Sequence, residues 1–137
     1  MTQLLLLEGE NGRKFSIKYH IIFVCKYRKQ LLARQEIGEF MKLEMNRISK
    51  NSDFKIEAIE IDKDHIHLLI DSIPNISATQ IVRKLKQEST VSIWKQFPQL
   101  LKNHFWKERT FWTDGYFVST TGQASEETVR RYIENQG

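Results

Sequence analysis

The sequence has a single cysteine, Cys25, among its 137 residues. One cysteine excludes an intramolecular disulfide and a zinc site built from several cysteines, and it suits a reducing compartment such as the cytoplasm. Long apolar runs are also missing. The Leu4–Leu7 run is too short for a membrane span or a signal peptide, and no basic leader precedes it. We therefore expect a cytoplasmic protein that does not act in a membrane.

Glycine-rich phosphate loops, internal repeats and low-complexity segments are absent from the sequence as well. Without a phosphate loop, a nucleotide cofactor is not expected. The length, with 40% hydrophobic and 28% charged residues, predicts one soluble domain over residues 1–137. Residues 1–12 fit none of the patterns below and are treated as an extra N-terminal segment.

Positive charge exceeds negative charge by four, and the basic residues gather in clusters. Such clusters are compatible with phosphate binding, but they are equally often ordinary solvated faces. The residues that we take as candidate DNA contacts are Lys26, Arg28, Arg83, Lys84, Lys86, Arg130 and Arg131. Further basic residues in the same kind of cluster are Lys29, Lys102, Lys107 and Arg109.

The apolar pattern alternates between the periods of strands and helices. Strands are predicted at Lys14–Tyr27, Phe54–Ile61, His65–Ile70 and within Phe111–Thr121, and helices at Gln35–Ser49, Ser77–Phe97 and residues 124–137. A tight turn at Asp62–Asp64 joins the second and third strands, and Gly115 is a predicted turn or bulge in the last stretch. Ile22 and Val24 interrupt the polar face of the first strand, which indicates that its middle is covered on both sides. Leu100–Arg109 is ambiguous, with Trp106 as an anchor of a loop or short strand. The order predicts an α+β, ferredoxin-like βαββαβ antiparallel sheet with an added C-terminal helix. Right-handed crossovers place the first and third strands in its centre.

Two histidines, His65 and His67, stand two residues apart on the third predicted strand. Their side chains point to the same face, with attachment points about 6.6 Å apart, so both imidazoles can lean towards one divalent metal. A bare His-x-His pattern taken alone favours the plainer alternative of two histidines on a polar sheet face. The C-terminal helix is what strengthens the metal interpretation.

That helix has a predicted N-cap at Ser125 and carries Tyr132 and Gln136 on one face, four residues apart. A nucleophilic hydroxyl and a neutral oxygen ligand would then be presented together. The alternative is that Tyr132 fills a core and Gln136 ends a fraying helix.

Four segments resemble the single-tyrosine transposases of the IS200/IS605 insertion-sequence family, which belong to the endonucleases with a His-hydrophobic-His motif. The matching segments are Tyr19–Arg28, His65–His67, Phe111–Gly122 and the helix with Tyr132. The resemblance runs from about Phe15 to Gly137. It implies a bacterial or archaeal transposase that cuts single-stranded DNA through Tyr132, leaves a 5′-phosphotyrosine and binds hairpins at the element ends. It also implies a homodimer in which Tyr132 of one subunit serves the histidines of the other.

The chemistry expected of this set is metal-dependent. Two imidazoles and the Gln136 oxygen leave coordination positions open, as catalytic sites do, and mixed nitrogen and oxygen ligands suit Mg²⁺ or Mn²⁺. A phenol with a pKa near 10 is about 0.1% ionised at neutral pH, so Tyr132 needs help to lose its proton. Asp64 and His20 are both open candidates for that base.

Two other functions remain in competition. A domesticated relative could bind hairpin nucleic acid without cutting it, although the joint presence of His65, His67, Tyr132 and Gln136 argues against this. A replication or conjugation nickase could use the same chemistry, but the chain has no helicase or other additional domain.

Overall fold

The computed structural model describes residues 17–120 and 126–136. Its strands are β1 (Ile17–Val24), β2 (Lys55–Ile61), β3 (His65–Ser72) and β4 (Phe117–Ser119). Its helices are α2 (Gln35–Lys50), α3 (Ala78–Gln96), α4 (Pro98–His104) and α5 (Glu126–Glu134), with short 3₁₀ turns η1 (Lys26–Arg28) and η2 (Leu31–Ala33). No helix in these described ranges is long and apolar enough to cross a membrane.

The strands form one antiparallel sheet in the order β2-β3-β1-β4. β1 and β3 are therefore the central pair, as the right-handed crossover rule predicted, and the α+β fold with its added helix is confirmed. β2 and β3 form a tight hairpin, in which the Asp62 amide donates to the His65 carbonyl at 3.0 Å. A strand held on both sides in this way keeps its side chains in fixed positions.

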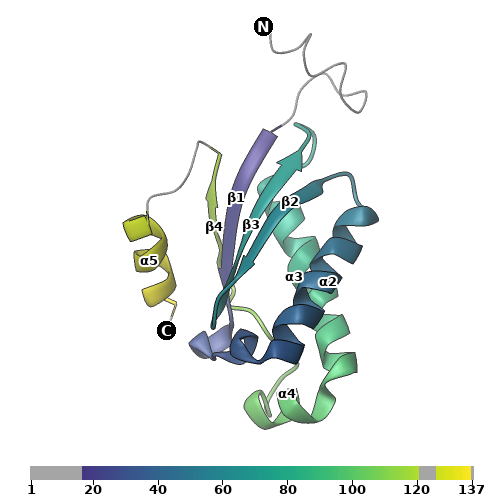
Figure 1. Cartoon of the computed structure of the whole chain (residues 1–137), viewed down its shortest axis with the longest axis vertical. Coiled ribbons are helices and arrows are strands. Elements are labelled where there is room, and N and C mark those ends of the chain that lie inside the picture. Colours follow the sequence, from purple (N-terminus) through teal and green to yellow (C-terminus); the bar gives the residue numbers. More distant parts are fainter. Residues whose placement is uncertain (1–16, 121–125, 137) are drawn as a thin grey trace, which may run out of the picture.

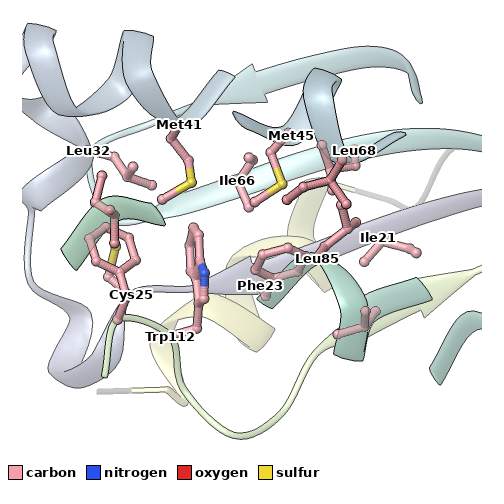
Figure 2. Close-up of a cluster of buried hydrophobic side chains, with 14 of the residues drawn as sticks. Ile21, Phe23, Cys25, Leu32, Met41, Met45, Ile66, Leu68, Leu85 and Trp112 are labelled. Carbon is pink, nitrogen blue, oxygen red and sulfur yellow. The ribbon is translucent and has the colours of Figure 1, made fainter. Parts of the chain in front are cut away.

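Helices α2 and α3 cover one face of the sheet, whereas α5 lies over the other (Figure 1). We call these the helix face and the histidine face. The helix face carries the fully buried Ile21 and Phe23 of β1 and Ile66, Leu68 and Ile70 of β3. Figure 2 shows Ile21, Phe23, Ile66 and Leu68 of these strands in one cluster with Met41 and Met45 of α2 and Leu85 of α3. The burial of this apolar surface is the main stabilising contribution to the domain.

The two long helices begin and end close to where the sequence predicted. α3 begins after a capping box, in which the Ser77 hydroxyl accepts from the Gln80 amide and the Gln80 side chain accepts from the Ser77 amide. Reciprocal satisfaction of two free amides fixes the start of a helix. Pro98 separates α3 from α4 and occupies the first turn of α4, where the missing N–H costs nothing.

Three predictions need correction. β1 ends at Val24 instead of Tyr27, because the chain turns sharply at η1, where Tyr27 and Arg28 have positive φ. The segment from Leu100 begins in α4, not in a loop or strand. Trp106 does not anchor it: its side chain is 74% exposed, and Phe105 is buried instead.

The last strand falls within the predicted stretch Phe111–Thr121, where Phe117–Ser119 pairs with β1. Trp112 makes a single bridge to Cys25, and the chain is irregular around Gly115, the position predicted as a turn or bulge. The predicted N-cap Ser125 and the first three residues of the predicted first strand, Lys14 to Ser16, lie outside the described residues, as does the extra segment 1–12.

Candidate active site

The two histidines of β3 point to the histidine face, as the alternation predicted. His67 is paired with Ile22 of β1, and His65 with Val24. Their side chains are 30% and 18% exposed, so both are accessible at the surface while the strand backbone is fixed. The sheet therefore presents two imidazoles side by side on one face.

A chain of polar contacts orients His65. Its Nδ1 lies 3.0 Å from Oδ1 of Asp64, a carboxylate that is 9% exposed. Arg28 donates from Nε to the other oxygen of Asp64 at 3.3 Å. In a neutral imidazole, a carboxylate beside Nδ1 favours the tautomer that carries the proton there, which leaves the lone pair on Nε2 of His65 available to a ligand. The carboxylate behind the histidine is the arrangement expected for a metal ligand.

The second histidine is flanked by His20 and Glu60. Nε2 of His67 lies 3.2 Å from Nδ1 of His20, and its Nδ1 lies 3.8 Å from the exposed Glu60 carboxylate. Burial lowers the pKa of His67, and the nearby His20 and His65 lower it further, against an opposing effect of Glu60. His67 is therefore neutral at pH 7, which is the protonation state that binds metals.

The described residues contain no group of three or more His, Cys, Asp or Glu side chains that could hold a metal ion. The sequence predicts Gln136, whose side chain is of another type, as a further ligand. Gln136 lies in the turn after α5, where its amide donates to the Ile133 carbonyl at 3.0 Å. Two imidazoles on one sheet face, with His65 oriented by Asp64, are a nitrogen donor set compatible with a divalent cation that also takes oxygen ligands.

Tyr132 lies on α5, whose apolar residue Ile133 packs on Ile22 and Val24 of the histidine face. This packing explains the two apolar residues that interrupt the polar side of β1. The Tyr132 ring packs on Phe117, with centroids 5.9 Å apart. In the described structure, neither Tyr132 nor Gln136 makes a hydrogen bond or ring contact with His65 or His67. The structure therefore places the predicted site residues in two groups, with His65 and His67 on β3 and Tyr132 and Gln136 on or just after α5.

The Tyr132 hydroxyl is buried beside the segment that precedes β4. A Cβ placed on Gly115 would lie 3.8 Å from it. Burial raises the pKa of Tyr132 to about 12, and the Thr113 hydroxyl partly offsets this rise without reaching the geometry of a full hydrogen bond. Neither candidate base is in contact with this hydroxyl: Asp64 binds His65 and Arg28, and His20 contacts His67.

Lys86 fixes the segment beside Tyr132. Its ammonium donates to the carbonyl oxygens of Thr113 at 2.6 Å and Gly115 at 2.7 Å. Burial lowers its pKa to about 8, although Asp114 acts in the opposite direction. The sequence marked Lys86 only as a candidate DNA contact, because nothing local to α3 indicates a partner 27 residues away.

The other candidate DNA contacts are scattered over the surface. Lys26 lies over the ring of Tyr27, and Arg28 binds Asp64. On α3, Arg83 is exposed while Lys84 pairs with Glu88 at 2.9 Å. Arg130 and Arg131 are exposed on α5. Arg28 is connected to His65 through their shared partner Asp64.

Comparison with known proteins identifies the family. Residues 13–136 match the family model described as "Transposase IS200 like". The chain is 30% identical to the ISDra2 transposase TnpA of Deinococcus radiodurans, over 99% of this chain and 97% of that protein. It is 29% identical to the transposase for insertion sequence element IS200 of Salmonella typhimurium, over 90% of this chain and 78% of that one.

Solved structures agree with this result. A crystal structure of a candidate transposase from Deinococcus radiodurans R1 superimposes with a TM-score of 0.80 at 29% identity, covering 89% of this chain and 92% of that one. A REP-associated tyrosine transposase bound to a REP hairpin shares the fold, with a TM-score of 0.56 at 12% identity over 86% and 62% of the two chains. Since the family match spans nearly the whole sequence, the chain belongs to the IS200-like transposases.

Proposed function

We propose that this transposase is a metal-dependent single-strand DNA endonuclease and strand transferase of an insertion sequence, with Tyr132 as nucleophile. One observation carries the proposal. His65, oriented by Asp64, stands beside the neutral His67 on a sheet face that the tyrosine helix overlies. A pair of oriented imidazoles next to an element that carries a hydroxyl nucleophile suits phosphodiester chemistry.

His65 and His67 would hold Mg²⁺ or Mn²⁺, with Gln136 as the oxygen ligand. When bound, such a cation polarises a non-bridging phosphodiester oxygen and stabilises the charge of the transition state. The protein's own contribution is orientation. Asp64 fixes the His65 ring, and the pairing of β3 between β1 and β2 fixes the positions of both imidazoles.

In the proposed step, the Tyr132 oxygen forms a bond to phosphorus while the bond from phosphorus to the 3′ oxygen breaks. The phenol loses its proton, the departing 3′ oxygen gains one, and the products are a 5′-phosphotyrosine and a free 3′-hydroxyl. The covalent bond conserves the energy of the phosphodiester, so another 3′-hydroxyl can reverse the step without a nucleotide cofactor. Cutting and rejoining then use the same residues.

The packing of Tyr132 bears on how the site is assembled. A hydroxyl with a pKa near 12, buried beside Gly115, is a poor nucleophile where it lies. We propose that α5 acts when docked on the histidines of a partner subunit in a homodimer. A mixture of Tyr132→Phe protein with His65→Ala/His67→Ala protein tests this, because each variant alone has no complete site. Recovery of cleavage supports docking in trans, and its absence after confirmed subunit exchange contradicts it.

The proposed substrate is single-stranded DNA that carries a hairpin at each element end. The related REP-associated transposase was solved bound to a hairpin, which supports this substrate for a chain of the same fold. The surplus of basic residues suits a phosphate backbone.

The deciding experiment incubates the protein and Mn²⁺ with labelled single-stranded DNA from the flanks of its own gene. A 3′-labelled strand should become covalently attached to the protein, whereas a 5′-labelled strand should yield a shorter free fragment. Tyr132→Phe should bind the DNA but form no adduct. Tyr116→Phe, which loses a hydroxyl bonded to Thr79, is the matched control and should keep the adduct. Hairpin binding with no cleavage by the wild-type protein would instead favour the non-cleaving hairpin binder.

A further inference from the structure

A hollow that none of the proposed catalytic residues lines lies between η1 and the segment that follows α4. Its volume is about 560 Å³, within the range of small-ligand sites. The residues that line it are Tyr27, Lys29, His104, Phe105, Trp106, Lys107, Glu108 and Thr110. The chemistry described above uses none of them.

Two large aromatic side chains of this hollow face the solvent. Trp106 is 74% exposed and Tyr27 is 62% exposed, whereas Trp94 and Trp112 are 5% and 4% exposed. Phe105, buried at the base of the hollow, lies 6.4 Å from the Tyr27 ring between centroids. Exposing indole and phenol rings forgoes the free energy of their burial, so a surface that keeps them together indicates a binding role.

The backbone conformation at Tyr27 also indicates a functional role. Tyr27 and Arg28 have φ of 60° and 52°, and they are the only non-glycine residues in the described ranges with positive φ. Hydrogen bonds maintain this turn: the Arg28 amide donates to the Cys25 carbonyl at 2.8 Å, and the Arg28 side chain donates to Asp64. Left-handed backbone at bulky residues is costly and is concentrated at functional sites. Here the turn keeps the Tyr27 ring at the surface.

The aromatic rings are accompanied by positive charge. Lys29 lies 5.9 Å from the Phe105 centroid, and Lys107 lies 4.9 Å from that of Trp106. Burial lowers the pKa of His104, and the charges of Lys29 and Arg34 lower it further, so two cations act on this residue of the lining. Glu108 is the one carboxylate in the lining. The hollow therefore offers aromatic faces and cations in the same place.

We propose that this hollow, here called the aromatic hollow, binds an unpaired base of single-stranded DNA together with its flanking phosphate. The base stacks on Trp106 and Tyr27, and the phosphate is held by Lys29 and Lys107. Stacking on aromatic side chains within a cationic groove is how single strands are bound without sequence readout. A protein partner is disfavoured, because lysine is depleted from the cores of protein interfaces. The inference rests on the proposed function, since it assumes a single-stranded DNA substrate.

The position of the aromatic hollow suits that substrate. Arg28, next to Tyr27, binds Asp64, and Asp64 in turn binds His65. The hollow therefore adjoins the end of the sheet at which β3 begins. DNA held there lies beside the strand that carries both histidines. The hollow thus supplies a binding subsite next to the proposed cleavage site.

The test uses tryptophan fluorescence of Tyr132→Phe protein, which cannot cleave, with an oligothymidylate of about ten nucleotides, within known single-strand site sizes. Because Trp106 is the one exposed tryptophan of the three, stacking should quench its emission. Trp106→Phe should abolish the quench. Trp106→Ala should weaken binding roughly 5- to 150-fold, the range for loss of one stacked base. Leu43→Ala, which removes an exposed side chain from α2, is the matched control and should leave affinity unchanged.

An abasic oligomer of equal length separates stacking from charge. The abasic oligomer should bind the Tyr132→Phe protein about as weakly as oligothymidylate binds the Tyr132→Phe/Trp106→Ala protein. Adding Trp106→Ala should not lower the affinity for the abasic oligomer any further. Lys107→Glu should lower the affinity for both oligomers, because it removes a phosphate contact. Equal oligothymidylate affinity with and without Trp106→Ala would overturn the proposal. A change of sedimentation mass caused by Trp106→Ala in the absence of DNA would also overturn it and would assign the surface to protein association.

The two proposals fail separately. Adduct formation by the wild-type protein, with no change in Trp106 emission, would contradict only the aromatic hollow. Quenching by oligothymidylate, with no adduct on any flanking strand, would contradict the cleavage mechanism and leave the hollow as a single-strand binding site.

Discussion

The two faces of the sheet differ in how their residues are used. On the helix face, Phe23, Ile66 and Leu68 are fully buried against α2 and α3. On the histidine face, the apolar cover is limited to Ile133 and its neighbours on β1 and β4, and His65 and His67 stay partly exposed. The same two central strands supply both faces, because successive side chains point in opposite directions.

Because the two faces differ, alternate residues of one strand contribute either to stability or to the proposed chemistry. In β3, Ile66 lies between the two histidines in sequence but belongs to the core, so the core fixes the strand that presents the imidazoles. Substitutions on the two faces should consequently have distinct effects. Changes on the histidine face should remove activity with little loss of stability, and changes on the helix face should do the reverse.

The largest effect is expected for His65→Ala/His67→Ala. Loss of both imidazoles should reduce metal-dependent cleavage by roughly 10³-fold or more, the scale of losing a main transition-state stabiliser. The free energy of unfolding should change by about 1 kcal/mol or less, because both side chains are partly exposed. Calorimetric titration with Mn²⁺ and urea denaturation measure the two quantities. His104→Ala is the control for Mn²⁺ affinity only, because His104 lines the aromatic hollow. Equal Mn²⁺ affinity in the double variant and the wild type would exclude this metal site.

The converse substitution is Phe23→Ala. Phe23 is fully buried and packs edge-on against Trp112 at 4.7 Å between centroids. Its truncation should lower the free energy of unfolding by about 3–5 kcal/mol through reduced burial and a cavity. Urea denaturation should show a lower midpoint. Phe117→Ala, on the partly covered histidine face, should cost less. If Phe117→Ala lowered the free energy of unfolding as much as Phe23→Ala does, α5 would contribute to stability as strongly as α2 and α3.

A smaller effect is expected for Lys86→Met, which removes the donor to Thr113 and Gly115. Leaving two carbonyl groups without this partner should cost about 1–3 kcal/mol at pH 7. Lys84→Met, which breaks only an exposed pair with Glu88, should cost about 0.5 kcal/mol or less.

Lys86→Met should also change how the stability of the protein depends on pH. The pKa of Lys86 is about 8 in the folded protein and 10.5 ordinarily, so the unfolded chain binds more protons between these values. Stability from this group therefore rises as pH rises through that window. The advantage of the wild type over Lys86→Met should grow from about pH 8 to about pH 10.5 in thermal denaturation. The raised pKa of Cys25 acts equally on both proteins and cancels. A constant difference would show that Lys86 is not desolvated.

The smallest effect is expected for Arg83→Glu/Lys84→Glu on the exposed side of α3. If these residues bind phosphates, the log–log salt slope of single-strand hairpin binding should fall by about 0.7 for each phosphate that the variant no longer neutralises. Fluorescence anisotropy at several salt concentrations measures the slope, with Lys95→Glu as control. A reduced slope would show that the elements on the helix face also serve DNA binding. An unchanged slope would leave Arg83 and Lys84 as solvated charges.

Much of this organisation could be predicted from local sequence patterns. The alternation in β1 and β3 identified their faces, the tight turn at Asp62–Asp64 joined β2 to β3, and the Ser77 signal marked the start of α3. Ile22 and Val24 even indicated that something covers the second face, which proved to be α5. These patterns succeed because strand and helix periods, capping groups and turn residues act over a few neighbouring positions.

The remaining features depend on contacts between residues far apart in the chain. The pairing of His20 with His67, the Arg28–Asp64–His65 series and the Lys86 bonds to Thr113 and Gly115 each join separate elements. The turn that ends β1 at Val24 and keeps Tyr27 exposed, and the exposure of Trp106 after α4, have no pattern of their own in the sequence. The sequence by itself thus determined which residues share a strand face. Only the tertiary structure decided which of them meet, because sheet register and helix docking bring together positions that no local period relates.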